Sequence, residues 1–87
     1  MCNEKERLAF GLEIGRNIRR LRLERKMTQE QLAEAVNCHP DKISQYELGK
    51  LQPDTYFLQT LADYFNVPLS DILPTKGVAN HEKRQAN

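Results

Sequence analysis

The sequence predicts a small all-α domain, because apolar residues recur every three or four positions and no segment alternates as a strand would. The chain has 87 residues, so we expect one domain of marginal stability. The expected organisation is an N-terminal extension over residues 1–10 that can hold the start of the first helix, a folded unit over 11–73 and a flexible polar tail over 74–87.

The first helix is expected to run from about residue 8 or 11 to residue 25. Its apolar residues lie four, four and three positions apart, which is the spacing of one amphipathic stripe. They are Phe10, Ile14, Ile18 and Leu21.

Two neighbouring helices are expected in the stretch TQEQLAEAVNCHPDKISQYELG, residues 28–49. Thr28 is a favourable N-cap, and Gln31 three residues later completes a capping box, so the second helix is expected over 29–36. Asn37 follows at a position where a left-handed residue is wanted, and asparagine tolerates that conformation.

The third helix is expected over residues 40–48. Pro40 suits its first position, where the missing N–H leaves nothing unpaired, and Gly49 suits its end. The connection from the second helix is only about three residues, which sets the two helices at a steep angle of about 90–120°. The start of the third helix is then left exposed with short or flexible polar side chains, as a helix that reads base edges in the major groove requires.

A fourth helix is expected after Asp54, which is a favourable N-cap. Its apolar residues are Phe57, Leu58, Leu61, Ala62 and Phe65. A short fifth helix is expected to contain Leu69, Ile72 and Leu73 and to stop at Pro74. Apolar surface left over on this last helix would support pairing of two chains.

Charge is unevenly distributed along the chain, although the net charge is only +1. Residues 11–26 contain six basic and two acidic residues, whereas residues 51–75 contain three acidic and no basic ones. A local basic surface can attract phosphate in a nearly neutral chain. An ordinary solvated helix face explains the same arginines equally well.

The chain resembles the helix-turn-helix domain of the lambdoid phage repressor and Cro family, also called XRE-like regulators. The resemblance spans Gly11 to Leu73 and rests on Ile14-Gly15, Ile18, Leu21-Arg22, Thr28-Gln29, Leu32-Ala33, Ile43-Ser44, Tyr46-Glu47, Gly49, Pro53, Leu61-Ala62, Val67 and Leu73. It implies a compact, five-helix, lambda-repressor-like DNA-binding domain over residues 11–73. It also implies a cytoplasmic homodimer that regulates transcription by binding double-stranded DNA, at an operator expected to be an inverted repeat.

The family's residue roles, carried over to matching positions, imply a recognition helix at about 40–48. The implied base-reading residues are Pro40, Asp41, Lys42, Ser44 and Gln45. The implied phosphate-binding residues are Thr28, Gln29, His39, Lys50 and Tyr56. The implied structural ion pair is Arg22 with Glu47, and two solvated charges are the alternative. Pro40 can offer only an apolar contact, so base reading would rest mainly on Lys42 and Gln45.

Other function classes have little support in the sequence. Cys38 and His39, taken with Cys2 and His81, fit no structural zinc spacing, so neither a metal nor a cofactor is expected. No arrangement of nucleophile, base and phosphate loop indicates an enzyme. No apolar run approaches the length of about 18 residues that a membrane span needs. The remaining alternative is a protein-interaction or antitoxin-like module of the same fold.

Overall fold

The computed structural model describes residues 4–74 as four α-helices and one 3-10 turn, without a strand in that range. The elements are α1 (Glu4–Glu24), α2 (Gln29–Ala35), α3 (Pro40–Leu48), α4 (Thr55–Phe65) and the 3-10 turn η1 (Leu69–Asp71). The predicted all-α class is therefore confirmed. The predicted fifth helix is corrected to a single 3-10 turn, and the expected tail over 74–87 lies outside the described residues apart from Pro74.

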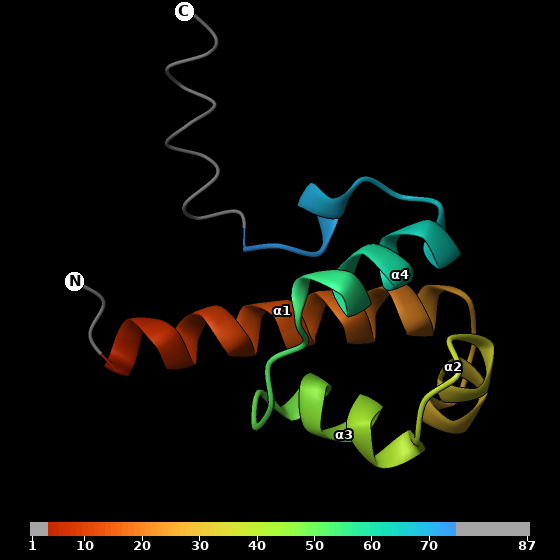
Figure 1. Cartoon of the computed structure of the whole chain (residues 1–87), viewed down its shortest axis with the longest axis horizontal. Coiled ribbons are helices and arrows are strands. Elements are labelled where there is room, and N and C mark those ends of the chain that lie inside the picture. The colour runs from red at the N-terminus through yellow and green to blue at the C-terminus, as the bar shows by residue number, and fades with distance from the viewer. Residues whose placement is uncertain (1–3, 75–87) are drawn as a thin grey trace, which may run out of the picture.

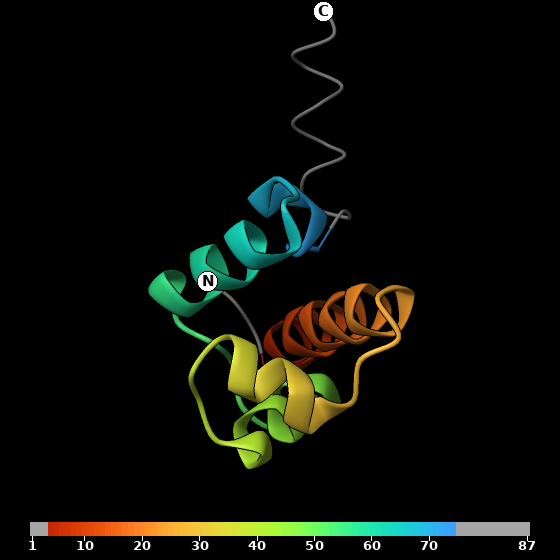
Figure 2. The same ribbon diagram turned by 90° about the vertical axis from the view of Figure 1, so that its right-hand side faces the viewer.

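The long helix α1 runs across the whole molecule, and the shorter elements pack against it (Figure 1). α3 lies along one side of α1, and α4 with η1 lies on another. α2 packs near the C-terminal end of α1 and meets α3 at a steep angle, as the short connection between them predicted (Figures 1 and 2).

The hydrophobic core lies where these helices face one another. Its buried residues are Ile14, Ile18, Leu21, Leu32, Ala33, Val36, Ile43, Tyr46, Leu58, Leu61, Ala62, Phe65 and Ile72. Phe10 was predicted to belong to the same stripe, but its side chain is 44% exposed. α1 also begins at Glu4, earlier than expected, so its first turns extend beyond the part of the helix that the core covers.

Local capping signals set the helix boundaries around the turn. Thr28 Oγ1 accepts a hydrogen bond from Gln31 N at 3.0 Å, and Gln31 Oε1 accepts one from Thr28 N at 2.9 Å, which completes the predicted capping box. Asn37 has φ of 63°, so its predicted left-handed conformation is confirmed. Gly49 ends α3 as predicted, with φ of 78°. Asn66, which the sequence did not single out, ends α4 in the same conformation.

The segment after α4 closes the core. Ile72 is fully buried, and Asn17 Nδ2 of α1 donates a hydrogen bond to its carbonyl oxygen at 2.8 Å. Leu69 and Leu73 are half-buried and pack against the same core. The expectation that Ile72 leaves apolar surface for pairing is therefore wrong, because α1 and α4 already enclose it.

Candidate nucleic-acid interface

Helix α3 has a buried face and an exposed face. Ile43, Tyr46 and Glu47 are buried against the rest of the molecule. Of the residues expected to read bases, Asp41, Lys42 and Gln45 are exposed, while Pro40 and Ser44 are half-buried. The helix is thus anchored by one side, and its polar side chains are free to contact a partner on the other.

The start of α3 is held by a side-chain cap. His39 is the N-cap, and its Nδ1 accepts a hydrogen bond from Asp41 N at 3.1 Å. In the neutral imidazole the proton then sits on Nε2, which remains a hydrogen-bond donor. Asp41 also places a carboxylate 3.8 Å from His39 Nδ1, and both side chains are largely exposed. The cap fixes the first turn of α3, and it leaves Nε2 of His39 able to donate to an acceptor such as a phosphate oxygen.

A polar cluster joins α1, α2 and α3, and we call it the clamp: the buried Arg22 and Glu47 with the half-buried Gln29. Arg22 Nε donates to Glu47 Oε2 at 2.6 Å, and Arg22 Nη2 donates to Glu47 Oε1 at 3.0 Å. Gln29 Nε2 donates to the same Oε1 at 3.0 Å. The remaining guanidinium nitrogen, Arg22 Nη1, donates to Met27 O at 2.7 Å, so the charged groups are fully paired.

The clamp sits next to a close contact between two backbones. Gly15 of α1 lies so near α3 that an added Cβ atom would be 2.3 Å from the Tyr46 carbonyl oxygen and 2.7 Å from that of Glu47. Only glycine fits at that separation. α1 therefore fixes the position of α3 through direct backbone packing and through the clamp.

Two weakly acidic groups near the α2–α3 turn remain neutral at physiological pH. Burial raises the pKa of the Cys38 thiol, although the nearby Lys42 ammonium partly opposes this effect. Burial also raises the pKa of the Tyr46 hydroxyl, and Cys38 and Asp54 add to the shift. Neither group therefore adds charge to the surface around Asp41 and Lys42.

The loop after α3 carries Lys50, which is exposed. Its backbone is fixed because Lys50 N and Leu51 N both donate to Gln45 O, at 2.9 and 3.3 Å. Tyr56, in the first turn of α4, is 80% exposed. Its neighbour Phe57 packs against the Tyr46 ring with centroids 5.2 Å apart, which ties the first turn of α4 to α3.

Two of the residues expected at phosphates have internal contacts, of which the sequence predicted the Thr28 cap but not the contact of Gln29 with Glu47. The Thr28 hydroxyl accepts the capping hydrogen bond, and the Gln29 amide holds Glu47. Gln29 contacts Glu47 because folding places the start of α2 beside this buried glutamate. No pattern in the sequence around Gln29 indicates the contact. The structure also brings Arg22 and Glu47 into contact, although they are 25 residues apart in sequence.

Within residues 4–74 no group of three or more His, Cys, Asp and Glu side chains is arranged to hold a metal ion. In the same range, no helix combines the length and the apolar character that crossing a membrane demands.

Comparisons with known proteins agree with this architecture. The chain is 32% identical over 62 residues to the HTH-type transcriptional activator BcrR of Enterococcus faecalis, covering 71% of this chain and 30% of that protein. It is 28% identical over 76 residues to the immunity repressor protein of Bacillus phage phi105, covering 87% of this chain and 53% of that protein. The matched region thus spans 30% of the length of the first relative and 53% of the length of the second.

Among solved structures, the fold is similar to that of the restriction-modification controller protein C.AhdI from Aeromonas hydrophila. The TM-score is 0.67 with 19% identity, and the similarity covers 71% of this chain and 94% of that one. A family model described as helix-turn-helix matches residues 18–72, which is more than half of the chain. The chain therefore belongs to the XRE-type helix-turn-helix family.

Proposed function

We propose that this chain is a sequence-specific, double-stranded-DNA-binding transcriptional regulator whose helix α3 lies in the major groove. The observation that carries the proposal is the division of α3 into a buried, clamped face and an exposed face whose start is polar. Such a helix can enter the groove without losing its own support. The relatives' names include an activator and a repressor, so either direction of regulation is compatible with the family.

We assign DNA binding to residues 11–73 and give the exposed side chains separate roles. Lys42 can donate to guanine, and Gln45 can pair with both groups of an adenine edge. Asp41 is suited to accept from a cytosine amino group, and the half-buried Pro40 and Ser44 would add contacts at the edge of α3.

The DNA phosphates would be contacted by residues that flank α3, and not by the exposed face of α3 that contacts the bases. Lys50, Tyr56 and the free Nε2 of His39 have exposed donors for this purpose. Thr28 and Gln29 lie at the start of α2. Because their side chains are engaged in the cap and the clamp, we expect their contribution to be mainly positional.

The proposal includes a cytoplasmic homodimer on an inverted repeat. If two chains are related by a two-fold axis, their recognition helices should enter half-sites about 34 Å apart, one turn of DNA. No catalytic step, metal or cofactor is part of this function.

The test is a binding titration of two variants against an operator and a scrambled duplex at two salt concentrations. Gln45→Ala should cost roughly 1–3 kcal/mol on the operator and relax preference at one base pair per half-site, because it removes a base contact. Lys50→Ala should weaken both duplexes alike and lower the salt slope by about one unit, because it removes a phosphate contact.

If Gln45→Ala lowered the affinity for both duplexes by the same factor, α3 would not be the element that reads bases. No salt-dependent DNA binding by the unmodified chain would instead favour a protein-interaction or antitoxin-like module. The two results are distinguishable because the first still gives a complex with DNA and the second does not.

A further inference from the structure

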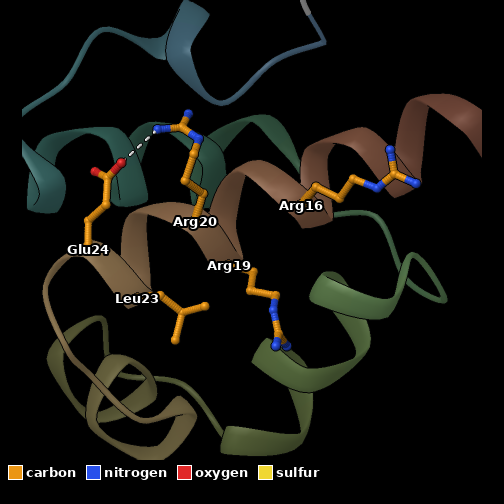
Figure 3. A pocket seen from close by; sticks show the side chains of 5 residues that line it. All are labelled: Arg16, Arg19, Arg20, Leu23 and Glu24. Atoms are coloured by element: carbon orange, nitrogen blue, oxygen red, sulfur yellow. Dashed lines mark hydrogen bonds and ion pairs between the residues drawn. The ribbon is translucent and has the colours of Figure 1, made fainter.

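The outer face of α1 carries a hollow that the DNA-binding proposal does not use. Its volume is about 480 Å³. It is lined by Arg16, Arg19, Arg20, Leu23 and Glu24, all from α1 (Figure 3). These positions lie on the opposite side of the helix from the buried Ile14, Ile18 and Leu21. The hollow is therefore a surface of α1 alone, and it is separate from the exposed face of α3.

The hollow has a surplus of positive charge. Arg20 Nη1 lies 3.3 Å from Glu24 Oε2, one turn further along the helix, and both side chains are at least half exposed. Arg16 and Arg19 form no ion pair with another residue in the range 4–74. In Figure 3, Arg19 extends toward α3, while Arg20 extends toward α4. The guanidinium groups of Arg16 and Arg19, which both precede Leu23 on α1, are thus available for carboxylates.

Leu23 gives the hollow an apolar component. Its side chain is 48% exposed although it is surrounded by arginines, whose aliphatic stems extend the apolar surface. A phosphate backbone would pair with the guanidinium groups and gain nothing from a leucine. A peptide that combines carboxylates with an apolar side chain would use both features.

We propose that this hollow docks an acidic, amphipathic segment of a partner protein. Carboxylates of that segment pair with Arg16 and Arg19, and one of its apolar side chains packs on Leu23. The C-terminal residues of this chain do not match the required chemistry, because 75–87 contain Lys76, Lys83 and Arg84 against a single acidic residue, Glu82. The surface therefore calls for another polypeptide of opposite charge.

The experiment uses the full chain and a fluorescein-labelled 14-residue peptide in which Glu and Leu recur at helical spacing. Fluorescence anisotropy is measured at low and at high salt, and the same peptide with every Glu replaced by Lys is the probe control. Arg16→Gln/Arg19→Gln should weaken binding about tenfold at low salt, and Leu23→Gln should weaken it about fivefold.

Two matched variants control for general effects of charge and apolarity. Arg7→Gln removes an exposed arginine of α1 outside the hollow, and Leu48→Gln removes an exposed leucine of α3. Both should bind the peptide within about twofold of the unmodified chain, while the lysine peptide should not bind. Affinity for a random DNA duplex should be unchanged in Leu23→Gln.

Three results would overturn the proposal. The first is no saturable binding of the acidic peptide, or equal binding by all variants. The second is that Arg16→Gln/Arg19→Gln lowers DNA affinity and the salt slope while Leu23→Gln changes nothing, which would make the surface a phosphate contact. The third is that the Leu23 and arginine variants change the sedimentation coefficient of the chain alone, which would make a second copy the occupant.

Discussion

Two arginines only two residues apart on α1 form very different ion pairs. Arg22 pairs with Glu47 of α3 through two hydrogen bonds, and the exposed fractions of the two side chains are 8% and 2%. Arg20 pairs with Glu24 of its own helix through one contact at 3.3 Å, and the exposed fractions are 50% and 59%.

The two pairs differ in their exposure to solvent and in the other groups that they contact. The exposed pair is screened by water and salt, and it constrains two long side chains for a small electrostatic gain. The buried pair is bidentate, is joined by Gln29 and links three helices. Its net value compared with an apolar pair of similar size can be small, but removing one partner leaves a buried charge unpaired. We therefore expect the loss of one partner to cost little stability in the exposed pair and much in the buried pair.

Breaking the buried pair should have the largest effect. Glu47→Ala should lower the free energy of unfolding by about 3–5 kcal/mol, because Arg22 would keep its charge in a buried site without a carboxylate. Denaturant unfolding measures this change. Arg22→Ala/Glu47→Ala should cost less than the sum of the two single variants. Additive losses of under about 1 kcal/mol each would mean that the clamp behaves like the exposed pair.

A substitution at the close backbone contact between α1 and α3 should give the second-largest loss of stability. Gly15→Ala should cost about 1–3 kcal/mol, because the new methyl group would overlap two carbonyl oxygens of α3 and separate the helices. Gly11→Ala is the matched control. Its added Cβ atom would meet only the side chain of Gln52, which can move, so this variant should be neutral or slightly more stable. Equal thermal midpoints for the two variants would contradict this reading of the α1–α3 contact.

Gln29, the third residue of the clamp, tests how much a single hydrogen bond to Glu47 contributes to stability. Gln29→Ala should cost about 1 kcal/mol, because Glu47 Oε1 loses one hydrogen bond but keeps that from Arg22. Calorimetry or urea unfolding resolves an effect of this size. A loss as large as that of Glu47→Ala would show that the amide, rather than the guanidinium, holds the carboxylate.

Removing one partner of the exposed pair should give the smallest change in stability. Arg20→Ala should change stability by less than about 0.5 kcal/mol, and the difference should vanish in about 1 M salt, where the screening length is near 3 Å. The effect of Glu47→Ala should persist under the same conditions, since the buried pair is shielded from ions. Parallel unfolding curves at low and high salt compare the two directly.

Sequence-local signals predicted much of the fold. Thr28, Pro40 and Gly49 gave the boundaries of the helix-turn-helix because capping and backbone preferences act within a few residues. Asn37 was identified for the same reason.

The parts that depend on distant contacts were predicted less well. The periodic stripe does not show where the core stops covering α1, so Phe10 was assigned to the core and the helix start was placed too late. The predicted fifth helix is only the single 3-10 turn η1, after which Ile72 is already buried. Its length is therefore set by packing against α1 and α4, which the local sequence does not show. In the candidate site, the contact of Gln29 with Glu47 joins residues 18 positions apart, and the sequence around either residue does not specify it.

The contact between Asn17 and Ile72 has a consequence for how the chain is made. The two residues are 55 positions apart, and synthesis proceeds from the N-terminus. At translation rates of about 5–20 residues per second, α1 would wait roughly 3–11 seconds for this partner to be synthesised. During that interval the part of the core that Ile72 fills stays open, even after α3 and α4 have been synthesised. The ribosome-bound nascent chain should therefore lack the Asn17 contact and keep this part of the core exposed until residue 72 has left the exit tunnel.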